Sequence, residues 1–237
     1  MPSKSTLTSF RRRIVKWFRK HGRDLPWRQT RDPYRILVSE FMLQQTQVSR
    51  VEGYYARFLE QYPDLKTLAA ASPGTVRESW QGLGYYRRAD NLHRLAQVVV
   101  GELDGTIPQD IEALRALPGV GRYTAGAVAT FAFEAAEPCV DTNVARVVRR
   151  AFHPRAGTKA PDQEKLWRTA RALVPAPGPA AWAFNQGIME LGATVCTARK
   201  ALCPACPVRT DCSTGKRRTR STPAHHRRNK GKQTKQA

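Results

Sequence analysis

The 237-residue chain has 41% hydrophobic and 25% charged residues, which is typical of a globular protein, and no apolar run long enough to span a membrane. Its 40 Lys and Arg against 19 Asp and Glu give a net charge of +21, so the first candidate for a partner is nucleic acid. Nine of the basic residues lie in 216–237, a stretch without acidic residues that we expect to be disordered. Without that stretch the chain still carries +12, so its folded part is basic in its own right.

Apolar residues recur at helical spacing along most of the chain. Leu7, Phe10 and Ile14 share one face of the first predicted helix. Asp32 and Pro33 offer an N-cap and a first residue for the second. The predicted helices cover 6–21, 33–45, 48–60, 64–71, 86–102, 109–116, 122–133, 142–152, 162–173 and 180–195. Alternation with a period of two is scarce, so the sequence predicts an all-α protein.

Glu40, on the second predicted helix, has the apolar neighbours Ile36, Leu37 and Leu43. A carboxylate in that setting loses hydration, so its pKa should rise and it should hold a proton near neutral pH, as a general acid must. The alternative is an exposed surface glutamate. A second acid, Asp141, stands directly before a predicted helix and can cap it.

Gly119 and Gly121 lie between two predicted helices, in the segment Leu117-Pro-Gly-Val-Gly. Glycines let the backbone turn sharply, and the amides that open the next helix then form a nest for a phosphate group. An ordinary glycine turn is the alternative. With the basic excess, the segment favours contact with a nucleic-acid backbone.

Four of the five cysteines, Cys196, Cys203, Cys206 and Cys212, are spaced as C-x6-C-x2-C-x5-C. Thiolates this close in sequence can converge on one centre, either a 4Fe–4S cluster or a zinc ion. Structural zinc sites more often pair two C-x2-C units and this run has one, which favours iron. Disulfides are the alternative, but cysteine is otherwise sparse and no signal peptide opens the chain, so we expect a reducing, intracellular setting.

Several segments together resemble known DNA glycosylases. The pattern I-x-x-L-x-x-L-P-G-V-G-R-Y-T-A, from Ile111 to Ala125, resembles the helix-hairpin-helix of the superfamily that includes endonuclease III. The segments 25–28, 37–48, 82–86 and 184–193, with the cysteine run, are similar to the MutY family of adenine DNA glycosylases. The likeness extends over most of residues 7–212.

The resemblance implies a two-lobed, all-α helix-hairpin-helix fold. Residues 30–133 would form a six-helix barrel lobe that contains the hairpin. Residues 1–29 and 134–212 would form a second lobe that ends in a 4Fe–4S loop, followed by a disordered basic tail over 213–237. The implied partner is double-stranded DNA with a mismatched or damaged base pair, bound by a monomer.

The resemblance also implies catalytic roles. Glu40 would protonate the leaving adenine at N7, and Asp141 would stay ionised and stabilise the cationic sugar, much as paired carboxylates serve sugar hydrolases. Tyr123 and Asn143 would hold the geometry and the water. Members that also cut the strand carry a lysine at position 123 to attack the sugar, so Tyr123 implies a monofunctional glycosylase that leaves an abasic site.

The DNA-contacting residues implied by the resemblance form an adenine pocket, a wedge that fills the gap left by the extruded base, and contacts to the strand. They are Trp27, Arg28, Leu43 and Glu190 for the pocket, Gln45 and Tyr85 for the wedge, and Gln44, Gly119 and Gly121 for further contacts.

Two differences from the MutY family leave alternative functions open. MutY proteins continue into a domain that recognises 8-oxoguanine, where this sequence has a basic tail, and Thr142 stands where many of them have glycine. Thymine or uracil mismatch glycosylases share the tyrosine and lack that domain, so they are the first alternative, although the residues 44–47 favour the adenine branch. A non-catalytic DNA-binding module and a nuclease of the lyase type are the alternatives from other classes.

Overall fold

The structure is a computed structural model that describes residues 2–154 and 163–220. Across those residues the chain forms helices and loops, and its only β-type pairing is an isolated bridge between Cys196 and Ala201. The helices are α1 (Lys4–His21), α2 (Pro33–Leu43), α3 (Val48–Gln61), α4 (Leu65–Ala70), α5 (Pro73–Ser79), α6 (Arg87–Glu102), α7 (Ile111–Ala116), α8 (Arg122–Phe133), α9 (Thr142–Phe152), α10 (Gln163–Leu173), α11 (Pro179–Thr194) and α12 (Ser213–Arg220), with short turns η1 (Pro26–Arg28) and η2 (Cys203–Ala205). The all-α prediction is confirmed.

The predicted helices all occur, and the differences have local causes. Helix α5 was not predicted, although Ser72 caps it by accepting a hydrogen bond from the Thr75 amide. Helix α12 occupies the start of the segment expected to be a disordered tail, and the Thr214 hydroxyl ties it down by donating to the Arg150 carbonyl at 2.6 Å. The remainder of that tail, 221–237, lies outside the described residues.

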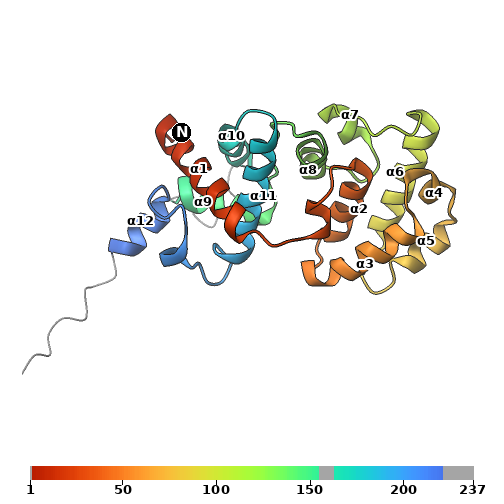
Figure 1. Ribbon diagram of the computed structural model, residues 1–237, viewed down its shortest axis with the longest axis horizontal. Helices are drawn as coiled ribbons and strands as arrows, with labels where there is room; N and C mark the ends of the chain where they lie inside the picture. The colour runs from red at the N-terminus through yellow and green to blue at the C-terminus, as the bar shows by residue number, and fades with distance from the viewer. Residues whose placement is uncertain (1, 155–162, 221–237) are drawn as a thin grey trace, which may run out of the picture.

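The helices gather into two lobes with separate hydrophobic cores (Figure 1). The core of the first lobe is built from α2 to α8, and that of the second from α1, α9, α10 and α11. Helix α11 packs on α1 and α9 and also contacts α8, so it lies at the junction. The chain passes from one core to the other between Cys139 and Val140.

Helix α2 runs through the first lobe and is buried along most of its length. The Asp32 side chain starts it, as predicted, by accepting hydrogen bonds from the amides of Tyr34 and Arg35. Because apolar residues cover almost every side of this helix, Glu40 must share the interior with them. The helix ends at Leu43, two residues before the predicted end.

Helix α11 approaches its neighbours closely where it carries glycine. A β-carbon at Gly192 would lie 2.7 Å from the β-carbon of Asn143, so only glycine lets α9 start at this distance from α11. That close approach fixes the start of α9 against the wall of the second lobe.

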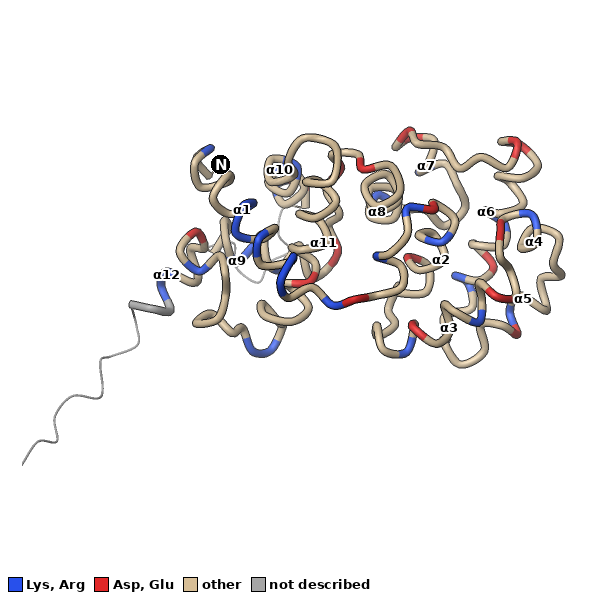
Figure 2. Tube along the Cα trace, in the orientation of Figure 1, with Lys and Arg blue, Asp and Glu red and all other residues tan. Residues whose placement is uncertain are grey.

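Positive charge lies on both lobes. Figure 2 shows Lys and Arg along the trace of the first lobe near α3 and α4, and in the second lobe along α1, on α9 and in the loop that follows α11. None of the helices in the described part of the chain has the length and apolar character needed to cross a membrane.

Candidate active site

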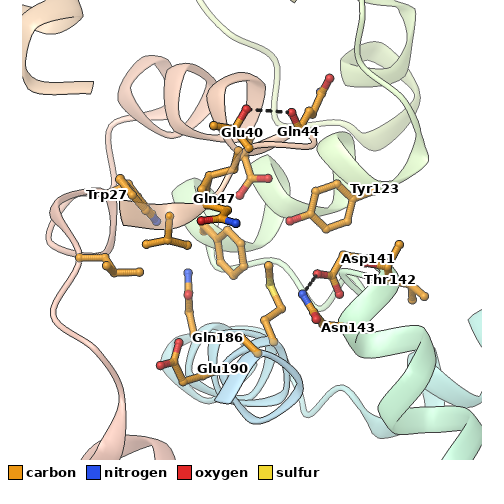
Figure 3. A pocket seen from close by; sticks show the side chains of 18 of the residues that line it. Trp27, Glu40, Gln44, Gln47, Tyr123, Asp141, Thr142, Asn143, Gln186 and Glu190 are labelled. Atoms are coloured by element: carbon orange, nitrogen blue, oxygen red, sulfur yellow. Dashed lines mark hydrogen bonds between the residues drawn. The ribbon is translucent and has the colours of Figure 1, made fainter. Parts of the chain in front are cut away.

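A cavity of about 780 Å³ opens between the two lobes. The first lobe contributes Glu40 from α2 and Tyr123 from α8, and the second contributes Asp141 and Asn143 from the start of α9 (Figure 3). Glu40 and Asp141, which are 101 positions apart in the sequence (141 − 40), therefore face the same cavity. The sequence predicted these four as catalytic, and the fold brings all of them together.

Glu40 is almost completely buried, with 4% of its surface exposed. Burial raises its pKa to about 7 and the nearby Asp141 adds to the rise, although a hydrogen bond with the Tyr123 hydroxyl opposes them. Its Oε2 atom has no hydrogen-bond partner in the described part of the chain. A carboxyl group that holds a proton near neutral pH and faces a cavity with a free oxygen can deliver that proton to a ligand.

Asp141 is the N-cap of α9 and is held on both oxygens. Its Oδ1 accepts a hydrogen bond from the Val144 amide at 2.6 Å, and its Oδ2 accepts one from the Asn143 side chain at 2.8 Å. Burial raises the pKa of Asp141, but these two donors favour the charged form and the helix N-terminus adds a positive dipole. Glu40 is more deeply buried and has one such donor, the Tyr123 hydroxyl, against the two at Asp141, so the proton belongs on Glu40 and the charge on Asp141.

Tyr123 and Asn143 support these two acids. Burial raises the pKa of Tyr123 well above its usual value, so the phenol stays protonated and donates to Glu40. Arg146 donates to Asn143 Oδ1 at 2.7 Å and to the carbonyl oxygens of Gly192 and Cys196. This orients the Asn143 amide so that its nitrogen faces Asp141.

The far wall of the cavity is an ion cluster that joins Glu190 of α11 to two arginines near η1. Glu190 has a fully buried side chain that accepts from Arg23 Nε at 2.7 Å and from Arg28 Nη2 at 2.8 Å. Arg28 also donates to Gln186 at 2.8 Å. Burial alone would raise the pKa of Glu190, but the two guanidinium groups outweigh it and hold the pKa below its usual value. The wall therefore offers charged and amide groups in fixed positions.

The other DNA-contacting residues predicted outside the hairpin turn divide into two groups. Trp27, Leu43, Gln44 and Gln45 line the cavity, as Arg28 and Glu190 do. Tyr85 does not line it, but protrudes from the first lobe with 60% of its surface exposed.

The two glycines of the hairpin turn lie outside the cavity and differ from each other. Gly119 has a φ of +76°, and a β-carbon there would lie 2.7 Å from the Asn91 side chain, so this position requires glycine. Gly121 caps α8 with an ordinary φ of −87°, and a β-carbon there would meet no atom within 4 Å. The conformational argument therefore holds for Gly119 alone.

Sequence reasoning missed Arg23, Gln186 and Met189, which also line the cavity. A signal existed for the last two, since 186, 189, 190 and 193 repeat at helical spacing and share one face of α11. No local pattern marks Arg23, which reaches Glu190 across 167 positions in sequence.

The four cysteines of the C-terminal run line a second, much smaller hollow, with a volume of about 20 Å³. No group of three or more His, Cys, Asp and Glu side chains within 2–154 and 163–220 is placed to hold a metal ion. Four thiols around one hollow have the donor chemistry that either an iron–sulfur cluster or a zinc ion requires. Two N–H groups point at these sulfurs, from Arg150 to Cys196 at 3.4 Å and from Gly215 to Cys212 at 3.3 Å.

The comparison with protein families gives this site a context. The family described as the HhH-GPD superfamily of base excision DNA repair proteins matches residues 38–175, which hold Glu40, Tyr123, Asp141 and Asn143. The chain belongs to this superfamily, and the predicted membership is confirmed.

Curated relatives include two kinds of glycosylase. The adenine DNA glycosylase of Mycolicibacterium smegmatis is 48% identical over 196 residues, which cover 82% of this chain and 66% of the relative. The thymine-DNA glycosylase of Aeropyrum pernix is 40% identical over 212 residues, which cover 88% of this chain and 95% of the relative. The chain spans about two thirds of the first relative and less than half of the rat adenine DNA glycosylase.

Solved structures share the fold. A thermostable thymine-DNA glycosylase superposes with a TM-score of 0.83 at 32% identity, covering 90% of this chain and 98% of that one. A non-covalent complex of endonuclease III with DNA superposes with a TM-score of 0.76 at 25% identity, covering 93% and 100%. The predicted endonuclease III-like fold is thereby confirmed.

Proposed function

We propose that this protein is a monofunctional DNA glycosylase of base excision repair that hydrolyses the N-glycosidic bond of a mispaired adenine and leaves an abasic site. The observation that carries the proposal is the pair of acids in one cavity: Glu40 is buried and has a pKa raised to about 7, and Asp141 accepts two hydrogen bonds that favour its charged form. The 48% identity to an adenine DNA glycosylase supports adenine as the base.

In the first step the Glu40 carboxyl donates its proton to N7 of an adenine that has left the duplex. The bond between N9 and C1′ then breaks, its electron pair goes to the base, and positive charge develops on the sugar. A charge about 4 Å from Asp141 is stabilised by about 4 kcal/mol at the effective dielectric constant of a protein, which corresponds to about a thousandfold in rate.

In the second step water adds to C1′ and gives its proton to Glu40, which the first step left ionised. Asp141 keeps its two donors throughout and so keeps its position. Tyr123 holds Glu40 and has no amine, so no Schiff base with the sugar forms and the strand stays intact.

The test uses duplexes that carry A:G, A:8-oxoguanine, T:G and U:G pairs, with strand breaks scored after alkali and also without it. We expect breaks at adenine, only after alkali, and loss of at least a thousandfold in rate for both E40Q and D141N. Binding without release of any base would reduce the protein to a DNA-binding module, and breaks without alkali would show a lyase.

A thymine or uracil mismatch glycosylase is the second candidate, because the thymine-DNA glycosylase of Aeropyrum pernix is 40% identical over 212 residues and a thermostable thymine-DNA glycosylase superposes with a TM-score of 0.83. Breaks at T:G and U:G alone in the same assay would establish this function in place of ours.

We further propose that Cys196, Cys203, Cys206 and Cys212 hold a 4Fe–4S cluster, which would organise the loop between α11 and α12. All four thiolates would be ligands, which leaves no position for substrate. Iron and acid-labile sulfide in equal amounts, with a broad visible absorbance, would support the cluster, whereas a colourless protein with one zinc per chain would refute it. The protein that carries this cluster would act on double-stranded DNA as a monomer.

A further inference from the structure

Arg88 is a buried cation that the mechanism above does not use. It lies in the first turn of α6 with 7% of its surface exposed. A positive charge at a helix N-terminus opposes the helix dipole, and burial of a guanidinium group is unfavourable unless its N–H groups find partners. An arginine kept in this position must therefore be explained by its contacts.

The Arg88 guanidinium bridges two loops of the first lobe. Its Nη1 donates to the last carbonyls of α2 and to the residue that follows, and its Nη2 donates to groups on both loops. The acceptors are the carbonyls of Phe41, Met42 and Gln44 for Nη1, and the Thr46 hydroxyl with the carbonyls of Leu83 and Gly84 for Nη2. One side chain thus ends α2 and ties the loop 44–47 to the loop 82–86.

Each of these loops carries an exposed residue in a strained conformation. Gln45 has a φ of +57° and Tyr85 a φ of +50°, in the left-handed region that residues with a β-carbon rarely adopt. The Arg88 guanidinium carbon also lies 5.6 Å from the centre of the Tyr85 ring. A backbone held in such a conformation needs surrounding contacts that fix it, and Arg88 supplies them to both loops.

We propose that Arg88 is a positioning residue that holds the loops of Gln45 and Tyr85 as one unit, so that both side chains enter the duplex together when the target base leaves it. This inference rests on the proposed function, because a role for Arg88 in placing Gln45 and Tyr85 requires that the protein extrudes a base from the duplex. It does not depend on which base is removed. Lysine cannot replace arginine here, because its ammonium is a single point with three donors and cannot reach acceptors on both loops.

The test measures base extrusion directly. A duplex with 2-aminopurine at the target position becomes more fluorescent when that base unstacks, and the E40Q background prevents its removal. We expect R88K to lower the fluorescence rise at least fivefold at saturating protein, while its Kd for fully paired DNA changes less than twofold. The matched control is R94K, on the same helix, whose exposed guanidinium donates to Asn91 and interacts electrostatically with Asp90, without a hydrogen bond to either loop within 2–154 and 163–220; it should behave as the parent.

A double-mutant cycle separates positioning from stability of the fold. If Arg88 acts through the wedge residues, R88K should cost nothing further in a Q45A/Y85A background. An equal fivefold loss there, or a fluorescence rise in R88K equal to that of R94K, would overturn the proposal, and so would a parent that shows no rise at all. A parent that unstacks 2-aminopurine but releases no base in the excision assay would refute the proposed function and leave the inference standing.

Discussion

The Tyr123→Phe substitution tests the assignment of the proton to Glu40. The phenol stabilises the ionised form of Glu40 by a hydrogen bond and so lowers a pKa that burial has raised to about 7. Removing the hydroxyl leaves the burial in place, so the pKa of Glu40 should rise further. A hydrogen bond to a charged group contributes about 1.5 kcal/mol, which corresponds to about one pH unit.

The assay is the single-turnover rate of adenine release at saturating protein, from pH 5 to pH 9. Because the protonated form of Glu40 is the active one, the rate should be level below pH 6 and should fall tenfold per pH unit well above the pKa of about 7. In Y123F the falling limb should move up by about one pH unit, and at pH 8 part of any loss in rate should be recovered.

If the falling part of the pH–rate profile moved to lower pH in Y123F, or did not move, this reasoning would be refuted. Y34F serves as the control, since Tyr34 is also a buried phenol of the first lobe but donates to the Tyr62 carbonyl. Its limb should coincide with that of the parent.

Four further outcomes follow from the structure. E40Q should raise the melting temperature at pH 8 more than at pH 5. The pKa of Glu40 is raised in the folded state, so its ionisation destabilises the fold as pH rises from about 4.5 through about 7, by up to about 3 kcal/mol. An equal gain in melting temperature at both pH values would contradict this. N185A should cost about 1–3 kcal/mol of stability and slow excision, since Asn185 bonds the Cys139 amide at 3.1 Å and the Glu137 carbonyl at 3.0 Å in the segment that leads to Asp141; rates equal to those of the parent would exclude this role. G192A should displace Asn143 and lower the rate with a loss of about 1–3 kcal/mol, measured by melting and single-turnover kinetics. Deleting 221–237, which removes Lys and Arg but no acid, should flatten the dependence of log Kd on log salt concentration, and an unchanged slope would show that the tail does not bind DNA.

The sequence predicted what depends on neighbours along the chain. The burial of Glu40 follows from the apolar residues three and four positions away on α2, and the cap at Asp141 from its place before α9. Both predictions are confirmed. The sharp turn at Gly119 follows from its residue type, and the structure shows the positive φ.

What the sequence could not predict depends on tertiary partners. The pairing of Arg23 with Glu190, and the reach of Arg88 to Phe41 across 47 positions, join elements that only the fold brings together. The left-handed conformations of Gln45 and Tyr85 are of the same kind, since neither residue type favours them and the contacts of Arg88 maintain them. The end of α2 at Leu43, two residues before the predicted end, also depends on Arg88, which lies outside the local sequence pattern but donates to the carbonyls of Phe41 and Met42.

The two acids come from opposite sides of the boundary at Cys139 and Val140, Glu40 from α2 of the first lobe and Asp141 from the start of α9 in the second. Neither lobe contains both acids, so the rate of base excision depends on how the two lobes are positioned relative to each other and not only on whether each lobe is folded. On gradual heating, excision should therefore cease while circular dichroism still records full helix content, and the temperature interval between the two events measures how firmly α8 and α11 hold the halves in register.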